Sequence, residues 1–195
     1  MSSGPLRVPG AKATLLLSLG MTMLGFWGAL GSAYQLSGQV PPPASGQEVS
    51  PEVAAQIDRI AEEVRASHLD EGAAVANLLA SALLIIGSLL LSARRATALW
   101  WTGHALLANI LYTIGVTGVQ LMQLQQFGSP FVLLAIAQQG PLPEGVTEAD
   151  LASVMISLAG GFIVLVGLAL IGAYLLLARL ARREDVGRFV RREAT

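Results

Sequence analysis

The chain has 195 residues, of which 53% are hydrophobic and only 13% carry a charge. This balance is too apolar and too poor in charge for an ordinary soluble domain. The chain has no cysteine, which excludes disulfides, thiolate metal ligands and a cysteine nucleophile. We therefore expect an all-α, multi-pass membrane protein built as a bundle of four membrane-spanning helices.

The first predicted span covers residues 13–36, which follow a short polar lead ending at Lys12. A membrane-spanning helix needs about 20 mostly apolar residues, and this charge-free stretch is long enough. The same features also fit a signal peptide cleaved near Gly31-Ser32-Ala33, although the apolar run exceeds the usual 7–15 residues. We expect the span to be retained, and cleavage stays open.

An amphipathic helix is predicted in the loop after the first span. Ser50 can cap it and Pro51 suits its first position, so we expect a helix over residues 51–69. Its apolar residues fall at helical spacing and form one narrow edge, a candidate contact with a partner. The edge either packs on the protein's own bundle or pairs with another chain. It consists of Val53, Ile57, Ile60 and Val64.

The second and third predicted spans cover residues 72–93 and 97–123. After them, Ser129-Pro130 favours the start of a new helix, which Gly140-Pro141 ends. This segment, 130–139, is too short to cross a bilayer because a helix rises only about 1.5 Å per residue. We expect a short interfacial helix there.

The fourth predicted span covers residues 148–178, after the capping pattern Thr147-Glu148-Ala149-Asp150. We expect this helix to continue into the arginine-rich tail, residues 179–195. Most Lys and Arg residues lie in the N-terminus, in the link at Arg94-Arg95 and in this tail, whereas most acidic residues lie in the other two loops. Cytoplasmic loops carry an excess of Lys and Arg. The pattern predicts cytoplasmic N- and C-termini, and the Arg-rich, Lys-poor composition hints at a bacterial inner-membrane protein.

Each span carries a stripe of small or weakly polar residues at helical spacing. In lipid, helices associate through such residues, so the stripes are first interpreted as the seams of the bundle. A sharper hypothesis is that the most polar members line a narrow path or a ligand site. These candidates are Asn77, Asn109, Thr113 and Gln120.

His104 is the one side chain inside a predicted span that can change its charge near neutral pH. Ionisable residues within a membrane are functional candidates. A structural role, proton or ligand handling, and haem or metal ligation all stay open for His104. We predict no metal or cofactor site, because no second histidine, cysteine or carboxylate is available at membrane depth.

The sequence predicts a protein without catalysis. General acid–base and metal-assisted chemistry both lack their side chains within the spans. We expect a small subunit, scaffold or assembly partner that contacts membrane lipids, other membrane proteins or itself, and no nucleic acid. The alternative is an oligomeric channel, or a transporter of uncharged solutes, lined by Asn, Thr and Gln of the second and third spans.

Overall fold

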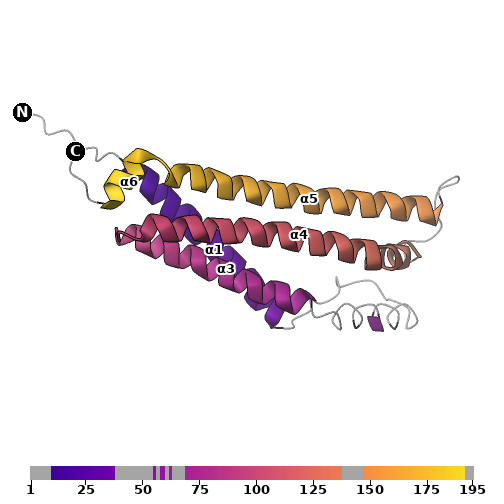
Figure 1. Ribbon diagram of the computed structural model, residues 1–195. Helices are drawn as coiled ribbons and strands as arrows, with labels where there is room; N and C mark the ends of the chain where they lie inside the picture. Colours follow the sequence, from indigo (N-terminus) through magenta and orange to yellow (C-terminus); the bar gives the residue numbers. More distant parts are fainter. Residues whose placement is uncertain are drawn as a thin grey trace, which may run out of the picture.

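The computed structural model describes residues 10–37, 69–137 and 147–191, together with positions 55, 58, 59 and 62; side chains are described except at 130, 131 and 133–137. This part of the chain is all-helical (Figure 1). Four of its helices are long and apolar enough to cross a membrane, as the charge-free stretches predict. The helices are α1 (Ala11–Leu36), α3 (Leu69–Ser92), α4 (Ala98–Ala137), α5 (Glu148–Ala181) and the short α6 (Glu184–Arg191).

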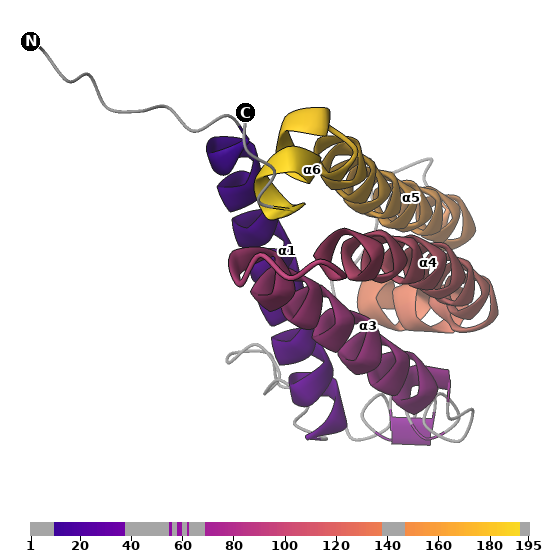
Figure 2. The same cartoon turned by 60° about the vertical axis from the view of Figure 1, so that its left-hand side comes forward.

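The four long helices form two pairs. α1 packs along α3, α5 packs along α4, and the contact between α3 and α4 joins the pairs. The pairs lie close together at the end where α6 sits and spread apart towards the opposite end (Figures 1 and 2). The bundle is therefore a wedge, narrow at the α6 end and wide at the other.

Apolar packing is tightest at the narrow end. Leu17, Met21, Leu84 and Leu106 are at most 1% exposed. They belong to one buried cluster to which α1, α3, α4, α5 and α6 all contribute. A close-packed cluster of this kind leaves no room for a passage at the α6 end.

Small and hydroxyl-bearing residues form the contact between α1 and α3, where the sequence predicts a seam. The Ser18 and Ser88 hydroxyl oxygens are 3.0 Å apart, and the Thr22 hydroxyl oxygen lies 2.6 Å from that of Ser88. A Cβ atom at Gly25 would lie 2.9 Å from the carbonyl oxygen of Ser81. Close backbone approach and uncharged hydrogen bonds are the means by which helices associate in lipid.

α6 folds back and covers the narrow end of the bundle. Val186 and Val190 are buried in the apolar cluster, with 0% and 1% of their surface exposed. On the neighbouring face, the guanidinium carbon of Arg94 lies 3.9 Å from the centre of the Phe189 ring, which is a cation–π contact. α6 therefore packs against the buried cluster and also contacts the link between α3 and α4.

The start of α1 meets the start of α6. Gly10 has a left-handed φ of +83°, and a Cβ atom there would collide with the carbonyl group of Asp185. Both the conformation and the contact thus require glycine. Arg183 donates two hydrogen bonds of 3.0 Å to the Asp185 carboxylate. These two hydrogen bonds are the main reason that the pKa of Asp185 lies below its ordinary value.

One predicted boundary is wrong. The span 97–123 and the short helix 130–139 are one continuous helix through Ala137, because residues 122–126 are all good helix formers and the helix continues past Pro130. The predicted continuation of the fourth span into the tail reaches Ala181, where α5 ends, and α6 then turns back. An apolar face of Val186 and Val190 can be buried only if the chain reverses onto the bundle.

The predicted outer helix at 51–69 falls almost wholly outside the described residues. Its described positions, Ala55, Asp58, Arg59 and Glu62, are helical and exposed. Its apolar edge therefore stays a prediction, because all four residues lie outside the description: Val53, Ile57, Ile60 and Val64.

Candidate functional site

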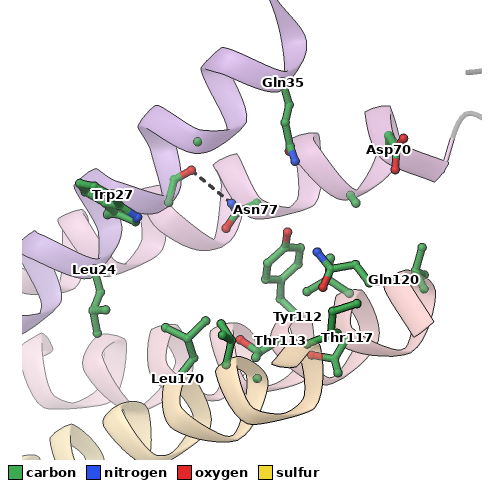
Figure 3. A pocket seen from close by; sticks show the side chains of 18 of the residues that line it. Leu24, Trp27, Gln35, Asp70, Asn77, Tyr112, Thr113, Thr117, Gln120 and Leu170 are labelled. Carbon is green, nitrogen blue, oxygen red and sulfur yellow. Dashed lines mark hydrogen bonds between the residues drawn. The ribbon is translucent and has the colours of Figure 1, made fainter. Parts of the chain in front are cut away.

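A cavity of about 500 Å³ lies between the two helix pairs, on the wide side of the buried cluster (Figure 3). Its size is that of an ordinary small-molecule site, which spans about 300–1,000 Å³. One wall is polar and comes mainly from α3 and α4, and the facing wall is apolar and comes from α1 and α5. The polar lining comprises Gln35, Asp70, Asn77, Tyr112, Thr113, Thr117, Gln120, Gln123 and Tyr174. The large apolar residues are Leu24, Trp27, Phe162, Ile163, Val166 and Leu170.

The structure brings three of the four predicted polar-path residues to this cavity. Asn77 from α3 and Thr113 and Gln120 from α4 all line it. Asn77 also donates a 3.2 Å hydrogen bond to the carbonyl oxygen of Gly28 (Figure 3), so it ties α3 to α1 at the cavity wall.

The fourth, Asn109, lies apart from the cavity lining and is only 2% exposed. Its amide nitrogen donates to the carbonyl oxygens of Ala80 and Ala105, both at 2.8 Å. Its amide oxygen accepts a 3.4 Å bond from the Tyr174 hydroxyl. Asn109 thus connects α3, α4 and α5, which is the role predicted for a seam residue rather than for a path.

A carboxylate and an amide group border the wide end of the cavity. Gln123 of α4 donates a 2.9 Å hydrogen bond to the carboxylate of Asp70 on α3. Both side chains line the cavity. This bond joins the two helix pairs at the point where they spread apart.

Several lining residues were not among the predicted site residues. Tyr112 and Thr117 of α4 line the cavity, as do Trp27 and Gln35 of α1. The α4 members have a signal in the sequence, because Tyr112 follows Asn109 by three positions and Thr117 follows Thr113 by four. The α1 members have none, since the facing helix is set by packing and not by spacing.

His104 lies on the exposed surface of α4, away from the cavity. Its Nδ1 lies 2.9 Å from the carbonyl oxygen of Trp100, one turn earlier in the helix. The imidazole and a Trp100 ring are 4.0 Å apart between centres, tilted by 34°. The ring is therefore held by its own helix.

Across the part of the chain that the structure describes, no three His, Cys, Asp or Glu residues gather in a way that could hold a metal ion. The cavity instead offers amides, hydroxyls and two phenols facing an apolar wall. Such groups donate and accept hydrogen bonds. No protein-family model, curated protein or solved structure matches the chain.

Proposed function

We propose that the chain is a multi-pass membrane protein that acts by binding and not by catalysis, as a small subunit, scaffold or assembly partner. Its place is the inner membrane of a bacterium, with both termini in the cytoplasm. The charge distribution along the sequence supports this orientation, because Arg and Lys gather at the α6 end and acids at the other.

The proposed role as a partner of another chain is supported by a row of small residues on α5. On the outer half of α5, Ser153, Ser157 and Gly161 recur every fourth residue and are exposed. Among the described residues, a Cβ atom at Gly161 would meet nothing within 4 Å, and the hydrogen bond of the Ser157 hydroxyl goes to the Ser153 carbonyl of its own helix. Small residues four apart are the usual contact face between membrane helices. Since the described part of the bundle leaves this row open, the row fits a helix of another chain, together with contacts of the outer loop.

The test is the mass of the particle purified in a mild detergent. The particle purified with the wild-type protein should contain a second chain, either another copy of the protein or another membrane protein. Replacing Ser157 and Gly161 with leucine should release that chain and leave thermal stability unchanged. The matched control is Gly172→Leu on the same helix, where a Cβ atom also has open space. Wild-type particles that contain one chain alone would contradict the proposal.

The alternative function is an oligomeric channel, or a transporter of uncharged solutes, lined by Asn, Thr and Gln. The presence of Asn77, Thr113 and Gln120 on one cavity favours it. The buried cluster of Leu17, Leu84 and neighbouring residues argues against a path through a single bundle, because the cluster closes the narrow end of that bundle. Glycerol-driven swelling of proteoliposomes distinguishes the two: a channel or transporter accelerates swelling, and a subunit or scaffold does not.

A further inference from the structure

The polar wall of the cavity contains side chains without a hydrogen-bond partner among the described residues. The Tyr112 hydroxyl and the Gln120 amide both reach into the cavity (Figure 3). Thr113, on the same wall, is satisfied by a 2.8 Å bond to the Asn109 carbonyl oxygen. In an apolar phase an unpartnered polar group is costly. Tyr112 and Gln120 are therefore free to bind a ligand without breaking a bond within the fold.

The facing wall is open to the surroundings of the helices. α1 and α5 come close towards the narrow end, where a Cβ atom at Gly20 would lie 2.9 Å from Leu177. Further out, Trp27 of α1 and Phe162 of α5 line the cavity yet are 79% and 66% exposed. A cavity-lining side chain that is also this exposed stands at the edge of an opening. The opening thus lies between α1 and α5, on the side that faces lipid when the helices span a membrane.

The charges of the lining residues restrict the charge that a ligand's head group can carry. None of the described lining residues is Lys, Arg or His. The one carboxylate, Asp70, lies at the wide end and accepts a hydrogen bond from Gln123. An anionic head group would find no cation here and would be repelled by Asp70.

We propose that this cavity binds an uncharged amphiphile, with a hydroxyl-bearing head and one hydrocarbon chain, that enters from the membrane between α1 and α5. The head bonds to Tyr112 and Gln120, and the chain lies against Leu24, Trp27 and Leu170. This inference goes beyond the partner role of the outer α5 row and does not depend on it.

The test uses a monoacylglycerol with a photoreactive diazirine in its chain, added to the full-length protein in lipid nanodiscs. Crosslinking should be saturable and should be competed by unlabelled 1-monooleoylglycerol. Lysophosphatidylglycerol, which is anionic, and hexadecane, which has no head group, should each compete at least about tenfold more weakly. For hexadecane, that margin matches the loss of the hydrogen bonds to the head group. For lysophosphatidylglycerol, it reflects repulsion by Asp70 and the lack of a cation in the lining.

Gly31→Phe is the variant that fills the cavity. Gly31 lines the cavity, and a Cβ atom there meets nothing within 4 Å, so the variant should fold and keep wild-type thermal stability while losing saturable crosslinking. Gly115→Phe is the matched control, because Gly115 has the same open space on α4 but does not line the cavity. It should crosslink like wild type.

Tyr112→Phe tests the head-group contact. It removes one hydroxyl and should weaken competition by between about twofold and tenfold, the range for one hydrogen bond. Tyr34→Phe, outside the cavity, should have no effect. Crosslinking that is not saturable, that survives Gly31→Phe, or that lysophosphatidylglycerol competes as well as monooleoylglycerol would overturn the proposal. None of these results bears on the particle mass that tests the partner role.

Discussion

Asn109 shows how a single amide can join three helices in an apolar surrounding. Its amide nitrogen donates hydrogen bonds to the Ala80 carbonyl of α3 and to the Ala105 carbonyl of its own helix. Its amide oxygen accepts a hydrogen bond from the Tyr174 hydroxyl of α5. Hydrogen bonds between membrane helices contribute on average about 0.6 kcal/mol and up to about 2 kcal/mol each. Asn109 is also nearly fully buried. It should therefore be among the most sensitive polar positions in the described part of the chain.

Asn109→Leu should lower unfolding free energy in detergent by about 1–2 kcal/mol, because two interhelical bonds are lost and the Tyr174 hydroxyl is left without a partner. Asn77→Leu is the matched control, since Asn77 is half-buried and makes one longer bond of 3.2 Å to Gly28. It should lose less than about 1 kcal/mol. Thermal unfolding of the two variants measures the difference. An equal or larger loss of unfolding free energy for Asn77→Leu would mean that the Asn109 hydrogen bonds do not hold the three helices together.

His104 gives the opposite expectation. Its side chain is exposed, and within the described part of the chain it bonds to the Trp100 carbonyl of its own helix. His104→Gln should change stability by less than about 0.5 kcal/mol, as surface substitutions do. The same variant should leave saturable monoacylglycerol crosslinking unchanged, because His104 does not line the cavity. A large change in either measurement would reassign His104 to a site that only an assembled form of the protein contains.

At the scale of the element, α1 and α3 are held together by close approach more than by large side chains. Gly25→Leu should destabilise the protein by more than about 2 kcal/mol, because its Cβ atom would lie 2.9 Å from both Ser81 and Ile85 and the helices must separate. Gly31→Leu, two turns further along the same helix, has open space and should be neutral. Unfolding in detergent compares them. Equal stabilities would show that the α1–α3 contact is looser than the structure has it.

The α6 helix is the second element whose contribution can be measured. Val186→Ala and Val190→Ala together remove four buried methyl groups, which at about 0.8 kcal/mol each amounts to about 3 kcal/mol. Arg188→Ala is the control, because Arg188 is exposed and its ion pair among the described residues is with Glu184 of its own helix, a pair of small effect. A double valine variant as stable as the control would indicate that α6 does not cover the narrow end in solution.

Charge-free length and helical spacing predict the four long helices and the polar faces of α3 and α4, since both features are local. They cannot predict where α4 ends, because the good helix formers at 122–126 compete with Pro130 and only the whole fold decides. The reversal into α6 has a local signal in the spacing of Val186 and Val190, but the tail's arginines hide it. The apolar wall of the cavity cannot be predicted from spacing, because Trp27 and Phe162 lie on different helices and reach the same cavity only through packing.

At the scale of the whole molecule, the long helices exceed what a bilayer requires. α4 has 40 residues, or about 60 Å at 1.5 Å per residue, against a hydrocarbon thickness of about 30 Å. A membrane-spanning α4 would therefore extend beyond the hydrocarbon. Its narrow-end neighbour α6 carries Arg183, Arg188 and Arg191 within or next to it, whereas Glu148 and Asp150 begin α5 at the wide end. The excess of α4 thus belongs at the acidic, wide end.

The proposed membrane orientation rests on this asymmetry and can be tested directly, because the chain has no cysteine. Single cysteines introduced at Ser45, Gln139 and Ala194 report the two predicted outer loops and the tail. With the arginine-rich end in the cytoplasm, the first two should react with an impermeant maleimide in intact cells. The third should react only after lysis, and denatured protein provides the control for full reactivity. Labelling of Ala194→Cys in intact cells would reverse the orientation, and it would also turn the wide, acidic end of the cavity towards the cytoplasm.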